Sequence, residues 1–255
     1  LRPLLTNISP KVYDKPRRLL GKESCAMRKW KIRFVLPVCL CCLLVCGMAV
    51  GSRYAWGVTL MQRAMAASSA YQYAHVVPAG ELAQALDGDA SLSTSQIVAA
   101  AEQVRQGVDG DMSPYFAGDL SQRFTQNCVS ALEVPLEWGF SVDAGNTHGQ
   151  LLSVEKESDT RARVRYRATS WLTTIYTYTS QGQPFYTVEV LCNRDTTTAL
   201  LENQNGQWKV LEQDIEIKEF APDSYQPIQG RFSTYPEALE FVNALDVNSI
   251  DPFVS

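Results

Sequence analysis

Hydrophobic positions along the chain fall into three successive patterns. Residues 34–51 form an apolar run of eighteen residues without a charge. From about residue 54 to residue 132, apolar positions recur at helical spacing, and after residue 132 they alternate with a period of two. The order of the patterns predicts one long apolar helix, then a group of amphipathic helices, then an antiparallel sheet.

The helical region divides into three predicted helices. The first covers residues 54–74, and its apolar stripe is interpreted as a packing face made by Leu60, Met61, Ala64, Met65 and Ala67. The second begins after Ser93, a good N-cap residue, because apolar residues follow it at helical spacing. The third is predicted to begin at Ser113-Pro114, with the proline in the first turn, and to run towards Cys128.

The region after residue 132 is rich in predicted strands, at residues 134–142, 151–157, 161–179, 185–193, 196–202 and 207–217. Alternation in the longest of them predicts one buried face, formed by Ala162, Val164, Tyr166, Ala168 and Leu172. Asn205-Gly206 is a strong hairpin signal between the last two strands. A short amphipathic helix is predicted at residues 235–245, within an irregular tail.

Gly206-Gln-Trp-Lys-Val210, which follows the Asn-rich turn, resembles the last hairpin of the nuclear transport factor 2-like superfamily. That resemblance covers about residues 92–218 and implies an α+β fold in which N-terminal helices pack on a cone-shaped, curved antiparallel sheet. The expected organisation is a basic segment at 1–33, an apolar helix at 34–51, a juxtamembrane helix and linker at 52–90, the cone-like domain at 91–219 and the tail at 220–255.

The apolar run is long enough to be a membrane span or an export signal. Ten of the 23 Lys and Arg residues and two of the 27 Asp and Glu residues lie in residues 1–33, so the balance there is +8 and that of the remainder is −12. Positive flanks stay in the cytoplasm, which predicts an extracytoplasmic C-terminal region anchored in the plasma membrane. Ala49-Val-Gly51 also resembles a cleavage site, and cleavage there would give a secreted protein.

Met27 is the first methionine of the chain, and a charged segment and the apolar run follow it directly. We hypothesise that residues 1–26 are translated upstream sequence or a dispensable extension. A peptide from residues 1–20 in the mass spectrum of the native protein would contradict this hypothesis.

One apolar helix followed by an exported domain of this kind resembles the single-pass assembly subunits of conjugation and type IV secretion machines. The resemblance implies a structural role beside other envelope proteins and supplies no corresponding site residues. The alternative is an exported cone that binds a small ligand or acts as an enzyme. An acidic exported domain is a poor candidate for binding nucleic acid.

Catalytic chemistry has little support in the sequence. The two histidines, His75 and His148, lie at a helix end and in a turn-like segment at 145–149, and only Asp143 is a candidate partner for His148. No Gly-rich phosphate loop, HExxH or CxxC motif occurs in the exported region. We therefore expect no catalytic residues, no metal site and no cofactor.

Two groups are candidate binding residues. Alternation places Arg161, Arg163, Arg165 and Arg167 in one row, which is either the solvated side of a strand or a surface that grips an acidic partner or anionic headgroups. An aromatic stretch that includes Trp171, Tyr176 and Tyr186 is either sheet packing or the lining of a ligand pocket.

Cys128 and Cys192 are the two cysteines of the exported region. They form either a disulfide, which the oxidising compartment permits, or two separate buried thiols.

Overall fold

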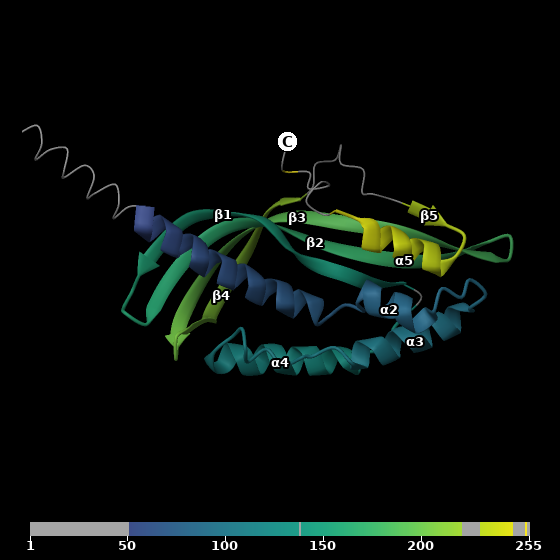
Figure 1. The fold of residues 1–255 in the computed structure, drawn as a ribbon, viewed down its shortest axis with the longest axis horizontal. Helices are drawn as coiled ribbons and strands as arrows, with labels where there is room; N and C mark the ends of the chain where they lie inside the picture. Colours follow the sequence, from purple (N-terminus) through teal and green to yellow (C-terminus); the bar gives the residue numbers. More distant parts are fainter. Residues whose placement is uncertain (1–50, 138, 221–229, 247–252, 254–255) are drawn as a thin grey trace, which may run out of the picture. The chain divides into compact units, whose positions relative to one another are not determined.

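The computed structural model describes residues 51–137, 139–220, 230–246 and 253 (Figure 1). The chain divides into two units, Leu1–Gly51 and Ser52–Ser255. The predicted apolar helix at 34–51 therefore lies outside the described residues except for Gly51. Within the described ranges, no helix is both long enough and apolar enough to cross a membrane.

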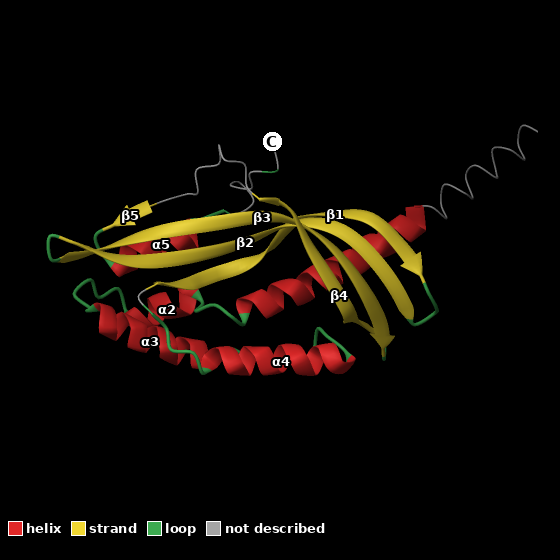
Figure 2. Cartoon of the chain, turned by 180° about the vertical axis from the view of Figure 1, so that it is seen from behind, coloured by secondary structure: helices red, strands yellow, loops and turns green. Residues whose placement is uncertain are grey.

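The second unit is α+β, as predicted, with helices packed on an open antiparallel sheet of five strands (Figure 2). After a helix over residues 51–73, the elements are α2 (Ala79–Leu86), α3 (Thr94–Gln106), α4 (Gly118–Leu132), β1 (Gly139–Lys156), β2 (Arg161–Ser180), β3 (Gln183–Gln204), β4 (Gln207–Phe220), β5 (Gly230–Phe232) and α5 (Tyr235–Ala244). The strand order is β1-β2-β3-β4, and β5 pairs with β3.

Local sequence signals explain where several elements begin and end. Ser93 donates from its backbone N and its Oγ to Gln96 Oε1, which confirms the predicted start of α3. Asn205 and Gly206 both have positive φ, at 55° and 86°, as a tight two-residue hairpin requires. The helix predicted at 235–245 is α5, which begins after the N-cap residue Thr234.

Three predicted boundaries are wrong. The third helix begins at Gly118 rather than Pro114, because the chain before it pairs with Val210 through the N–H of Ala117 and the C=O of Tyr115. The segment at 145–149 is part of β1 and not a separate turn. The predicted strands at 185–193 and 196–202 are one strand, β3. Helix α2, which follows Pro78, was not predicted.

Two hydrophobic clusters hold the helices on the sheet. Cluster 1 joins the helix over 51–73 and α4 to β2, β3 and β4, and its buried residues include Leu60, Ala64, Leu120, Val164, Tyr166, Ala199 and Leu201. Cluster 2 joins α2, α3 and α5 to β1, β2 and β3, and includes Leu82, Ile97, Phe140, Ile175, Tyr186, Val188 and Leu239. The apolar stripe predicted for the first helix is therefore a packing face, as expected.

The two clusters lie on opposite faces of the β2–β3 ribbon. Cluster 1 contains even-numbered residues of β2, such as Val164, whereas cluster 2 contains the odd-numbered Ile175. The pairing of β2 with β3 runs from Arg161↔Glu202 to Ser180↔Gln183 without a register shift, so no bulge explains the change. Strand twist accumulates along ribbons of this length, and Figures 1 and 2 show the strands crossing near the middle of the sheet.

We call the face that carries Val164 face 1 and the face that carries Ile175 face 2. In the first sheet half, β2 residues 161–168, face 1 is covered. In the second sheet half, β2 residues 172–180, face 2 is covered. This switch corrects the prediction for Leu172, which lies on face 1 just past the end of cluster 1 and is 37% exposed.

Candidate interaction surfaces

The four arginines of β2 lie on the uncovered face of the first sheet half. Ala162, Val164, Tyr166 and Ala168 alternate with them and are buried, so the arginines share face 2. We call Arg161, Arg163, Arg165 and Arg167 the arginine row. The structure therefore brings together the four residues that alternation in the sequence places in a row.

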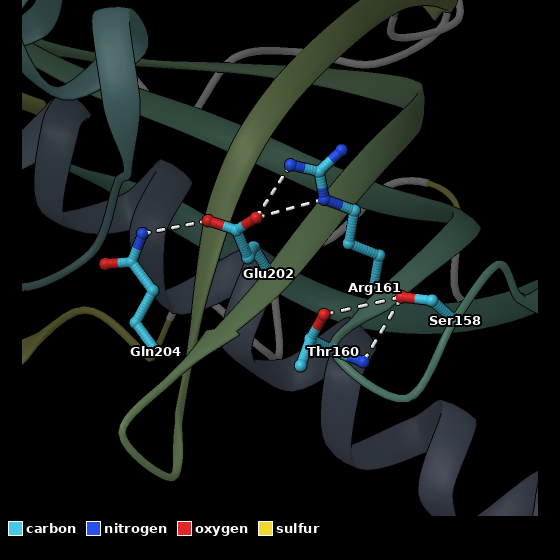
Figure 3. Close-up of polar contacts among 5 residues, drawn as sticks. All are labelled: Ser158, Thr160, Arg161, Glu202 and Gln204. Atoms are coloured by element: carbon cyan, nitrogen blue, oxygen red, sulfur yellow. Dashed lines mark hydrogen bonds and ion pairs between the residues drawn. The ribbon is translucent and has the colours of Figure 1, made fainter.

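Arg161 ends the row and is held by a carboxylate across the ribbon (Figure 3). Its Nε and Nη2 donate to Glu202 Oε1 at 3.0 and 2.8 Å, and Gln204 Nε2 donates to the other oxygen at 2.9 Å. The bonds from Gln204 and Arg161 lower the pKa of Glu202. The pair is partly exposed, so its contribution to stability is small, and its main effect is to fix the guanidinium.

Arg163 is also paired, through Nε to Glu157 Oε1 at 2.8 Å. Glu157 belongs to the β1–β2 turn, in which the backbone N–H of Thr160 donates to Ser158 Oγ at 3.2 Å (Figure 3). Glu202 on β3 and Glu157 in the turn therefore neutralise Arg161 and Arg163, the first two residues of the arginine row.

Arg165 and Arg167 form no ion pair with any residue of the described ranges. Arg165 is exposed, and the Nε atom of Arg167 is buried without a hydrogen-bond partner. Their neighbours across the ribbon are Thr198 and Thr196. The second half of the row therefore keeps two positive charges for an external group.

The three aromatic candidates lie in different places. Tyr186 is 3% exposed and packs edge-on against Tyr235 in cluster 2, with ring centroids 5.2 Å apart. Trp171 and Tyr176 differ in parity, so they project from opposite faces of β2. The three residues do not line one pocket.

Tyr176 belongs to an open groove of about 550 Å³ on face 1 of the second sheet half. Tyr178 and Phe185 stack in it with centroids 5.4 Å apart, and the Arg231 guanidinium lies 3.9 Å from the Phe185 ring centre. Burial, and then the negative charge of Glu189, raise the pKa of Tyr176. An open groove with this lining can contact an apolar or aromatic side chain.

Trp171 marks the change from one sheet half to the other. Its ring covers Gly145 of β1, where an added Cβ would lie 2.6 Å from the ring. Its Nε1 donates to Asp143 Oδ2 at 3.2 Å, whereas burial raises the pKa of that carboxyl. Asp143 therefore has a tryptophan partner instead of the histidine that the sequence allowed.

A buried polar group that the sequence analysis missed lies on face 1. Ser170 Oγ donates to Asp195 Oδ2 at 2.7 Å, and Asp195 Oδ1 is buried without a partner. Burial raises the pKa of Asp195 and raises that of nearby Tyr166 to about 12. Alternation predicted a buried Tyr166, but nothing in the local sequence distinguished Asp195.

Ser170 also reaches a second groove, of about 400 Å³, beneath the end of the first helix. Its lining includes Tyr71, His75, Leu172 and Leu191. His75 is exposed, and its Nδ1 lies 2.7 Å from the Tyr71 carbonyl oxygen. His148 lies in β1 with φ of 49°. Among the described residues, no group of His, Cys, Asp and Glu could hold a metal ion.

Cys128 and Cys192 are both buried thiols, so the disulfide is not formed in this structure. Cys128 lies in α4 and packs in cluster 1, where burial raises the pKa of its thiol. Cys192 shares face 2 of β3 with Tyr186 and Val188, which belong to cluster 2. Face 2 is not the face that packs against α4, so the two thiols lie on different sides of the sheet.

Comparison with known proteins gives no family for the chain. No protein-family profile matches the sequence, and no curated protein matches it either. One solved structure with a match is the intermembrane-space region of the chloroplast protein ARC6, at 15% identity and a TM-score of 0.29, covering 42% of this chain and 75% of that chain. A similarity this weak assigns neither a fold family nor a function.

Proposed function

We propose that this chain is a membrane-anchored, extracytoplasmic and non-enzymatic domain that serves as a structural or protein-interaction component of a cell-envelope complex, such as a conjugation or secretion machine. The apolar run at 34–51, with positive charge on one side, supports the anchor and its orientation. Helices followed by a curved antiparallel sheet, together with the closing Gly-Gln-Trp-Lys-Val segment, support a nuclear transport factor 2-like cone.

The uncovered apolar surface on face 1 of the ribbon carries the proposal. Leu172 and Leu191 are cross-strand neighbours that are 37% and 45% exposed, and Tyr178 further along the same face is 43% exposed. Exposed apolar side chains on one face of a sheet are typical of a protein contact. The grooves beside them are open, which favours a protein surface over an enclosed small molecule as the occupant.

The partner expected here is an apolar segment of another envelope protein. The ligand-binding alternative has less support, because Trp171, Tyr176 and Tyr186 do not line a common pocket. The groove that reaches Ser170 is its best remaining location, since a buried carboxyl lies directly behind that hydroxyl.

The test is site-specific photo-crosslinking of the full chain in native membranes. A photo-reactive phenylalanine at Leu191 should give adducts with another envelope protein, whereas the same group at Val129, an exposed residue of α4, should give few. Absence of a protein adduct at Leu191 and also at Tyr178 would contradict the proposed contact. Release of the intact chain from membranes by alkaline carbonate would contradict the anchor.

A further inference from the structure

The outer surface of the first sheet half carries two columns of opposite charge. Residues directly opposite each other in an antiparallel pair point to the same face. The registers of β2 with β3 and of β3 with β4 therefore define three rows on face 2: Arg163–Leu200–Glu212, Arg165–Thr198–Asp214 and Arg167–Thr196–Glu216. Each row reads basic, uncharged, acidic from β2 to β4.

The middle column is less exposed than the two columns beside it. Leu200 and Thr196 are each 4% exposed, whereas Arg165 and Asp214 are exposed on either side of them. Adjacent strands are about 4.8 Å apart, so the two charged columns are separated by about 10 Å. The surface thus has a shallow uncharged centre between a basic edge and an acidic edge.

The charges of the middle row, Arg165–Thr198–Asp214, are not paired within the described residues. In the part of the chain that the structure describes, neither Arg165 nor Asp214 has an ion-pair partner. Arg161 and Arg163, by contrast, are paired with Glu202 and Glu157. The row of Arg165 and Asp214 therefore keeps a positive and a negative charge for an external group.

Two copies of the sheet can stack with face 2 of one against face 2 of the other. A two-fold axis parallel to β3, midway between the two sheets, then places β2 of each copy opposite β4 of the other. The rotation keeps each row at its own height along the strand and exchanges the two sides. Arg165 of one copy then faces Asp214 of the second copy, and Arg167 faces Glu216, with both contacts formed twice. Such a contact is isologous, the kind that closes into a dimer.

We propose that the occupant of this surface is a second copy of the same chain, so that the protein forms a symmetric dimer through face 2 of the first sheet half. Long arginine side chains can span the gap between two outward-curving sheets, because they extend well beyond the low central column. The net negative charge of residues 34–255 opposes association, but charges further apart than about 8 Å are largely screened at physiological salt.

An acidic peptide or a phosphate group could also contact the arginines, but neither would need the acidic column on β4. Exchanging the charges of Arg165 and Asp214 within one chain distinguishes a second copy from an acidic peptide or a phosphate group. Arg165→Asp alone places two carboxylates opposite each other, and Asp214→Arg alone places two cations opposite each other. The double variant Arg165→Asp/Asp214→Arg restores opposite charges across the dimer and leaves the net charge of the chain unchanged.

The experiment is sedimentation velocity of the purified full chain in mild detergent, with thermal unfolding to show that each variant is folded. The parent chain should be a dimer, each single variant should dissociate with an affinity at least about tenfold weaker, and the double variant should regain the dimer. A monomeric parent would overturn the proposal. So would a double variant as weak as the singles, because opposite charges at positions 165 and 214 would then not hold the two copies together. The proposed function does not depend on the outcome.

Discussion

The two halves of the sheet are made by the same two strands, yet helices cover them on opposite faces. In the first half, the helix over 51–73 and α4 pack on Val164 and Ala199, and the arginine row is left outside. In the second half, α2, α3 and α5 pack on Ile175 and Val188, and Leu172, Leu191 and Tyr178 are left outside. A long twisted ribbon thereby presents one charged and one apolar surface without losing either core.

The largest expected effect tests whether the two sheet halves unfold together in one transition. Leu201 in cluster 1 and Leu239 in cluster 2 are both 0% exposed. Substitution of either by alanine should lower the free energy of unfolding by about 2–5 kcal/mol. Chemical denaturation measures this loss, and Ile215→Ala, at a residue that is 49% exposed, is the control with little expected change. Two separate transitions in the Leu239→Ala variant would show that the halves unfold independently.

The junction between the halves should be sensitive to added volume. In Gly145→Ala the new methyl group meets the Trp171 ring, and overpacking of this kind costs about 1–3 kcal/mol. Thermal unfolding measures the cost, and Gly80→Ala, where the nearest atom lies 4.0 Å from the added Cβ, is the matched control. The cost should largely disappear when Trp171 is also replaced by alanine. If it persists there, the ring is not the cause.

Helix α5 covers only the second half, so its N-cap should affect that half alone. Thr234 Oγ1 accepts from the Glu237 N–H, and Glu237 Oε2 accepts from the Thr234 N–H. Thr234→Ala should cost about 1 kcal/mol. Hydrogen exchange should become faster in α5 and not in α4, whereas Ser233→Ala should have little effect. Equal acceleration in both helices would indicate that the sheet transmits the change.

The smallest expected effect concerns the buried carboxyl of Asp195. Because the fold raises its pKa, its contribution to stability is fully present below the unfolded pKa, about 3.9, and is lost as pH rises through the folded value. Asp195→Asn removes the charged form and should stabilise the protein at pH 7 by less than about 1 kcal/mol. The gain should vanish towards pH 4 in thermal unfolding. Asp87→Asn, at an exposed helix end, serves as the control, and a gain that is independent of pH would contradict the assignment.

Local signals in the sequence predicted most of the fold. Helical spacing predicted the packing stripe of the first helix, Asn205-Gly206 predicted the β3–β4 hairpin, and alternation placed the arginine row on one face. The face switch could not be predicted, because alternation in β2 continues unbroken and only the accumulated twist changes which side meets the helices. Leu172 was misassigned for this reason.

The candidate surfaces were predictable only in part. The arginines were identified from their spacing, but their acidic counterparts on β4 depend on a register shift between Leu200 and Leu201, which the sequence did not reveal. Asp195 was not identified as a candidate because its hydrogen-bond partner, Ser170, lies on the neighbouring strand. The alternative of an aromatic pocket fails because Trp171 and Tyr176 differ in parity and lie on opposite faces of β2, and because Tyr186 is buried against Tyr235.

Cysteine accessibility along β2 tests the face switch most directly. Single cysteines are placed in the full chain at Arg165 and Tyr166 in the first half, and at Leu172 and Ile175 in the second. Labelling by a water-soluble maleimide is followed by peptide mass spectrometry, which separates the new thiols from the native ones. We predict fast labelling at the odd position 165 and the even position 172, and slow labelling at 166 and 175. Fast labelling at positions of the same parity in both halves would contradict the account.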